Sequence, residues 1–128
     1  MIKLANTIKV FVPVNDNDGV RVDLTSEIKS VIEVAGGATN YLARGSWVDG
    51  GKLYNDNLMV VQFNTAEFSN DLVRAVNNLV YAIFLKAEQL AVSVEVNGTL
   101  YILESIDDML ETFSDIEGIP AVTSLNIQ

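Results

Sequence analysis

The amino-acid sequence predicts an α+β domain in which helices pack on one face of an antiparallel sheet. Three observations predict this class. Several short runs alternate apolar and other residues, which is the period of a strand. Two longer segments repeat apolar residues at helical spacing, and two short turns stand between strand-like runs. With 128 residues, of which 49% are hydrophobic, the chain is long enough to bury one core.

The first element is a strand followed by a polar turn. Residues 7–14 (TIKVFVPV) alternate and are rich in β-forming side chains. The turn that follows, residues 15–19 (NDNDG), places Asp16 and Asp18 ahead of a glycine, as calcium loops do. The calcium-loop register, however, puts Val14 at the first position, where Asp is required. We therefore predict a solvated turn and no metal site.

A helix and a hairpin come next. Residues 24–37 (LTSEIKSVIEVAGG) predict a helix that Thr25 or Ser26 caps and two glycines end. Two strand-like runs follow, joined by Asp-Gly-Gly at residues 49–51, which tolerate the positive φ of a tight turn. Gly45 in the first run predicts a bulge or a close backbone approach. The second run holds the most apolar stretch (LMVVQF), so we place it centrally in the sheet.

The longest periodic segment predicts a second helix, capped by Ser69 or Asn70. Its apolar stripe is the expected core: Leu72, Val73, Val76, Leu79, Val80, Ile83 and Phe84. The polar face is expected to hold Arg74, Asn77, Asn78 and Lys86. A second hairpin follows, with the turn dipeptide at Asn97 and Gly98.

The order of elements is β-α-β-β-α-β with one further strand paired to the last. This is the ferredoxin-like arrangement, whose sheet leaves one face free. We expect residues 1–104 to form this domain and residues 105–128 to form an acidic C-terminal helix and tail docked on it. Residues 105–117 carry an apolar stripe and a capping box of Ser105 with Asp108, so this segment is a candidate cover for the free face.

Composition restricts the chemistry. The chain has no cysteine and no histidine, which excludes disulfides, thiolate nucleophiles and histidine-based catalytic or metal sites. No cofactor is implied. No segment reads as a signal peptide or a transmembrane helix, so the expected location is cytoplasmic, in the host cell if the gene is carried by a phage.

Charge is distributed unevenly. The net charge is −9, of which residues 104–128 contribute −6 because they hold six acids and no base. Such a surface repels nucleic-acid phosphates and anionic membranes, so we expect neither as a direct partner. A protein partner, if there is one, should be basic.

The sequence resembles a family of small bacterial and phage proteins of uncharacterised function. The resemblance covers residues 7–104 and rests on Gly-Gly-Ala-Thr at residues 36–39, Gly45-x-Trp47, the glycine turn and the second hairpin (EQLAVSVEVNGTLYIL). It implies a phage or mobile-element setting and brings no assigned activity. Many relatives carry a Glu in the strand after the turn, where this chain reads YNDN instead.

The glycine-rich segment 36–57 is also where a binding site is most plausible from composition. Aromatic residues with an arginine are typical of binding surfaces, and here such a set is Tyr41, Arg44, Trp47 and Tyr54. Trp47 itself we place in the core. An enzyme would have to rely on the polar members of this region and on Glu95: Asp49, Asp56, Glu95, Tyr41, Tyr54 and Arg44. Nothing in the sequence fixes two of the carboxylates at a defined distance.

The sequence therefore favours a non-enzymatic phage or mobile-element protein that inhibits a basic host defence or DNA-handling protein by acidic charge mimicry. The acids expected to bind that partner are Asp107, Asp108, Glu111, Asp115 and Glu117. Two alternatives stay open. One is a small-ligand-binding or cofactor-free enzymatic module, which could be a homodimer, and the other is a virion assembly component.

Overall fold

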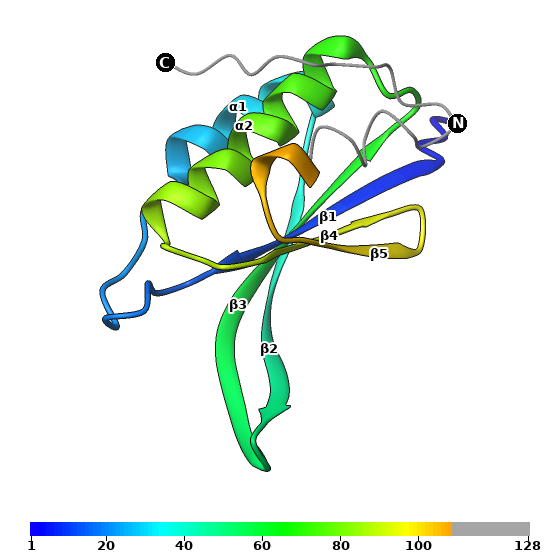
Figure 1. Ribbon diagram of the computed structural model, residues 1–128. Coiled ribbons are helices and arrows are strands. Elements are labelled where there is room, and N and C mark those ends of the chain that lie inside the picture. Colours follow the sequence, from blue (N-terminus) through cyan, green and yellow to red (C-terminus); the bar gives the residue numbers. More distant parts are fainter. Residues whose placement is uncertain (109–128) are drawn as a thin grey trace.

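The computed structural model describes residues 1–108, and the predicted ferredoxin-like fold is confirmed. The strands form one antiparallel sheet in the order β2-β3-β1-β4-β5, with α1 and α2 on one face of it (Figure 1). The elements are β1 (Asn6–Pro13), α1 (Thr25–Ala35), β2 (Thr39–Asp49), β3 (Lys52–Thr65), α2 (Asn70–Lys86), β4 (Val92–Val96) and β5 (Thr99–Leu103). No helix in the described part of the chain is long and apolar enough to cross a membrane.

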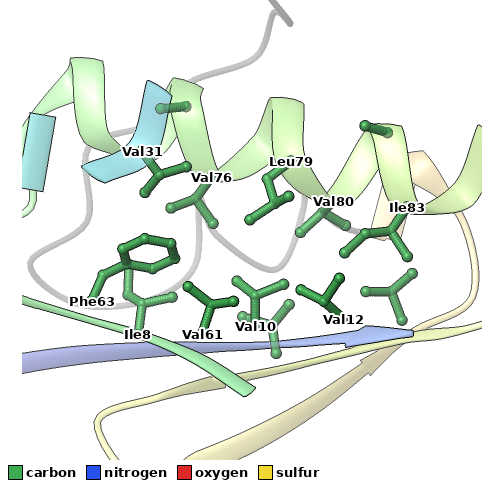
Figure 2. Packing of buried hydrophobic residues seen from close by; sticks show 14 of the residues in the cluster. Ile8, Val10, Val12, Val31, Val61, Phe63, Val76, Leu79, Val80 and Ile83 are labelled. Carbon is green, nitrogen blue, oxygen red and sulfur yellow. The ribbon is translucent and has the colours of Figure 1, made fainter. Parts of the chain in front are cut away.

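The core lies between the helices and one face of the sheet. Ile8, Val10 and Val12 occupy alternate positions of β1 and are 0 to 4% exposed. Figure 2 shows them beneath α2, whose Val76 and Ile83 point down onto the strands. Each fully buried side chain of this size stabilises the fold by about 1.5–3 kcal/mol. The apolar residues at alternate positions of β1 and those at helical spacing in α2 therefore pack together in one apolar layer.

Helix α2 buries the predicted stripe, with one correction on its polar face. Ser69 caps the helix, and its hydroxyl accepts a hydrogen bond from the backbone N–H of Leu72 at 3.1 Å. Asn77, expected on the polar face, is fully buried, and neither polar atom of its side chain has a hydrogen-bond partner. Asn77 follows Val73 by four residues and precedes Val80 by three, so it lies on the same side of the helix as they do.

Helix α1 ends as predicted but begins differently. Gly36 at its C-terminus has φ 91°, and its N–H donates to the carbonyl of Ile32. Neither Thr25 nor Ser26 caps the N-terminus, because Thr25 already lies inside the helix. The N-cap residue is Leu24, which has no capping side chain. Asp23, one residue before it, accepts a hydrogen bond at its Oδ1 from the N–H of Thr25 at 3.0 Å. This bond, together with one from the Thr25 side chain, lowers the pKa of Asp23.

Both predicted hairpin turns are confirmed. Gly50 and Gly51 have φ of 58° and 78°, and Asn97 and Gly98 have φ of 48° and 88°, as two-residue hairpin turns of the primed type require. The bulge at Gly45 is absent, since β2 and β3 pair without interruption through it. A Cβ at this position would lie 3.0 Å from Cδ1 of Leu58, so the close approach comes from a side chain and not from backbone.

The far half of the β2–β3 hairpin extends away from the rest of the molecule (Figure 1). We call residues 44–57 the arm; within it only Gly45 is partly buried. Strand β3 thus changes character along its length, because beyond the arm it buries Val60, Val61 and Phe63. It lies second from the sheet edge, and β1, not β3, is the middle strand.

The C-terminal segment begins as the sequence predicts. Ser105 Oγ accepts a hydrogen bond from the N–H of Asp108, and Asp108 Oδ2 accepts one from the N–H of Glu104, each at 3.1 Å. A helical turn follows at residues 106–108, and Ile106 packs against the core between helices and sheet. The first turn of this C-terminal segment therefore lies on the helix side of the sheet and does not cover the free face. The remainder of the predicted helix and tail lies outside the described residues.

Candidate functional site

The sheet face opposite the helices presents a continuous set of side chains from all five strands. Residues directly opposite each other in an antiparallel pair share a face. Phe11 of β1 pairs with Val60 of β3, and Ser93 of β4 pairs with Ile102 of β5. These residues have the opposite parity to the buried Val10 and therefore lie on the helix-free face.

A groove with a volume of about 910 Å³ opens where the arm leaves the sheet. Most of its lining comes from this face, and Ile83 of α2 with Ser46, Asn55 and Asn57 of the arm line it from the other side. Phe11, Pro13 and Leu58 supply apolar lining from β1 and β3, and Ile102 supplies more from β5. The arm forms one side, while the loop after β1 and the segment before β4 form the other. Small-molecule sites are typically apolar hollows of about 300–1,000 Å³ with a few polar groups, which this groove matches.

Two aromatic rings stand at the arm side of the groove. Trp47 and Tyr54 face each other across β2 and β3, with ring centroids 5.5 Å apart and an interplanar angle of 13°. The Nζ of Lys52 lies 5.1 Å from the Tyr54 centroid, so the ring of Tyr54 is engaged by both neighbours. Trp47 is 47% exposed, which corrects its predicted place in the core. The hairpin carries it beyond the reach of both helices.

The charged residues that line the groove are both acidic. They are Asp56 on the arm and Asp16 in the turn after β1; no Lys or Arg among residues 1–108 lines it. Asp16 Oδ1 accepts hydrogen bonds from the backbone N–H groups of Asp18 and Val20, each at 2.9 Å. Carboxylate oxygens of Asp16, Asp18 and Glu88 lie within 4.8 Å of one another. Negative charge therefore extends past this end of the groove.

A second polar cluster lies on the same sheet face, nearer to the N-terminal end of β1. Lys9 Nζ is 3.4 Å from Glu95 Oε2, and both side chains are about three-quarters buried. The hydroxyl of Tyr41 and then the carboxylate of Glu95 raise the pKa of Lys9 above its ordinary value, because both favour the charged ammonium. Lys9 is thus held as a cation beside an acid, outside the groove lining.

The structure separates the residues predicted for a ligand site into three places. Trp47 and Tyr54 come together in the groove, and Asp56 joins them. Tyr41 lies beside Lys9. Arg44 is three residues from both Tyr41 and Trp47 on β2, an odd number, so it projects from the opposite face of the strand. The candidate acids Asp49 and Glu95 do not line the groove.

The residues predicted to bind a basic partner are only partly described. Asp107 is exposed in the helical turn, whereas Asp108 is engaged in the capping hydrogen bonds. The other three, Glu111, Asp115 and Glu117, lie outside the described residues.

Sequence reasoning missed the groove residues contributed by other strands. Phe11, Pro13, Leu58, Ser93 and Ile102 come from four strands that are far apart in the chain. Each was assigned to a strand, and the alternation with buried neighbours places them on the free face. What the sequence does not contain is the register that brings Phe11 and Ser93 beside the arm.

Comparison with known proteins identifies a fold relative. No protein-family model matches the chain, and no curated protein matches it. Two solved structures do: a phage SAM lyase in complex with S-methyl-5'-thioadenosine, with a TM-score of 0.57 and 20% identity, and a phage SAM lyase in its apo state, with a TM-score of 0.53 and 18% identity. Each match covers 82% of this chain and 95% of the other. The shared fold extends over nearly the whole of that phage enzyme.

This likeness overturns the expectation of a non-enzymatic charge mimic. The chain shares its fold with a phage enzyme that has been seen with a small molecule bound, and no fold relative found here is an inhibitor of a host protein. The acidic tail that suggested mimicry contributes no lining residue to the groove among its described residues, 105–108.

Proposed function

We propose that this chain binds SAM, S-adenosylmethionine, in the groove beside the arm and cleaves it to S-methyl-5'-thioadenosine. One observation carries the proposal: a chain with the fold of a phage SAM lyase has an aromatic-lined groove where the arm leaves the sheet, and among residues 1–108 its charged lining is acidic. The other open alternatives, an assembly component and a purely partner-binding role, do not account for that groove.

The groove matches the ligand part by part. An adenine ring is flat and apolar on its faces, and the half-exposed indole of Trp47 offers it an aromatic surface to stack on. The hydroxyl of Ser93, which shares the free face with Phe11, also lines the groove and can bond a ribose hydroxyl. The acids fit the positive charge that SAM carries on its sulfur.

The reaction requires little acid–base chemistry. The carboxylate of the methionine part can attack its own Cγ, so that a C–O bond forms, the C–S bond breaks and its electron pair returns to sulfur. The products are a neutral thioether, S-methyl-5'-thioadenosine, and a five-membered lactone that keeps the ammonium group. No proton moves and no water is consumed. A chain with neither histidine nor cysteine can promote this step by folding the ligand into the reactive geometry and keeping water away.

The test is cleavage of SAM by the purified full-length chain, followed by mass spectrometry. We expect S-methyl-5'-thioadenosine and the lactone to form faster than in a protein-free sample, and Trp47→Ala to lose most of the excess rate. Asp71→Asn is the control, because Asp71 is exposed on α2 and remote from the sheet's free face. A rate equal to that of the protein-free sample would refute the proposal. An unsaturated four-carbon acid in place of the lactone would refute the displacement step.

A further inference from the structure

We infer that Asp56 makes the groove selective for a ligand with a positive charge at the sulfur position, so that the cationic substrate is held more tightly than the neutral thioether product. This rests on the proposed function and adds to it a residue that sets specificity and a reason for product release. The argument depends on where Asp56 stands relative to the aromatic pair.

The position of Asp56 follows from the strand register. On β3 it lies two residues from Tyr54, and on β2 its partner Gly45 lies two residues from Trp47. Side chains two residues apart on a strand share a face and are separated by about 7 Å. In an adenosyl ligand, the ribose and one further carbon separate the ring from the sulfur. An adenine stacked on Trp47 would therefore place its sulfur near the Asp56 carboxylate.

The surroundings leave this carboxylate available. Its cross-strand partner is a glycine, so no side chain stands between Asp56 and the groove from β2. Among residues 1–108, the salt bridges involve other acids, and none pairs with Asp56. The remaining charged lining residue, Asp16, has the same sign. A cation in the groove thus meets uncompensated negative charge.

Substrate and product differ in the charge that this carboxylate would sense. Cleavage converts a sulfonium cation into a neutral thioether and so removes its attraction to Asp56. A unit charge about 4 Å away in a water-exposed setting changes affinity about five-fold.

The experiment compares two adenosyl amino acids that cannot be cleaved by the displacement step. S-adenosylhomocysteine has a neutral sulfur, and sinefungin has an ammonium-bearing carbon in its place. Isothermal titration of the full-length chain at low salt should give about five-fold tighter binding of sinefungin. The ratio should fall toward one in Asp56→Asn and in 0.5 M NaCl, and stay unchanged in Asp71→Asn.

The outcomes separate the two proposals. Equal affinities in the wild-type chain, or a preference that survives Asp56→Asn, would overturn the role of Asp56 while leaving SAM binding in place. Binding of neither ligand, together with no cleavage of SAM, would overturn the proposed function and this inference with it. Circular dichroism of Asp56→Asn confirms that the variant is folded, as we expect for an exposed arm residue.

Discussion

The two halves of strand β3 have opposite surroundings. In the half next to β1, Val61 and Phe63 are fully buried under the helices. In the arm, every residue of β3 from 52 to 57 is exposed. The half of β3 next to β1 therefore stabilises the fold by burying apolar side chains. The arm half buries little and presents an aromatic residue and an acid to the groove. The difference teaches that stability and the proposed ligand site can be changed separately in this chain.

The largest expected effect contrasts one substitution in the two regions. Leu79→Ala, in α2 at 0% exposure, should lower the free energy of unfolding by about 2–5 kcal/mol, because it leaves a cavity in the core. Leu53→Ala, at a 60% exposed position of the arm, should change it by less than about 0.5 kcal/mol. Urea denaturation followed by circular dichroism measures both. Similar losses in the two variants would contradict the separation.

A second prediction concerns the polar atoms buried in the helix-packed region. Asn77→Leu should raise the free energy of unfolding by about 1–2 kcal/mol, because it removes an amide that is buried without hydrogen bonds. The same denaturation experiment reports it. A loss of stability would show that the Asn77 amide is hydrogen-bonded in solution.

Two hairpin turns provide a third comparison. Gly98, between β4 and the edge strand β5, and Gly51, at the tip of the arm, have φ of 88° and 78°. Alanine at either is strained by about 1–2 kcal/mol. We expect Gly98→Ala to lower global stability by that amount, and Gly51→Ala to fray only the arm, because a region without core contacts opens locally. Amide hydrogen exchange distinguishes local from global opening, and global destabilisation by Gly51→Ala would argue against this account.

The smallest effect is the acid dependence contributed by Asp23. Its pKa is lower in the folded chain than the ordinary 3.8, so its contribution to stability is complete above that value and is lost as the pH falls through the folded pKa. Wild type should exceed Asp23→Asn in stability near neutral pH, and the gap should close below pH 3.8. Thermal melts across this range test it; a constant gap would assign the effect to something other than the charge.

Local patterns in the sequence were sufficient for the fold. The alternation around Val10, the stripe around Leu79 and the turn at Asn97 each act within a few residues, and all three appear as expected. Asn77 was misplaced because polarity was given more weight than its spacing from Val73 and Val80. A single buried polar residue changes the composition of the buried helix face, but it leaves the helical spacing of the apolar residues unchanged.

The candidate site was predicted only where the chain itself brings residues together. Trp47 and Tyr54 are joined by one hairpin, so their proximity follows from the turn between them. Phe11 and Ser93 reach the groove through pairing of strands distant in sequence, which no local pattern encodes. Trp47 was assigned to the core from its residue type, and only the length of the hairpin shows that it stands beyond the helices.

The measurement that tests the central claim most directly uses the single tryptophan of the chain as its probe. Because Trp47 lies in the groove and nowhere near the core, its fluorescence should report ligand binding and not folding. Titration with S-methyl-5'-thioadenosine, corrected against free N-acetyltryptophanamide, should quench the emission in a saturable manner as adenine stacks on the indole. Emission that follows the free indole at every ligand concentration would contradict the assignment of the groove as the ligand site.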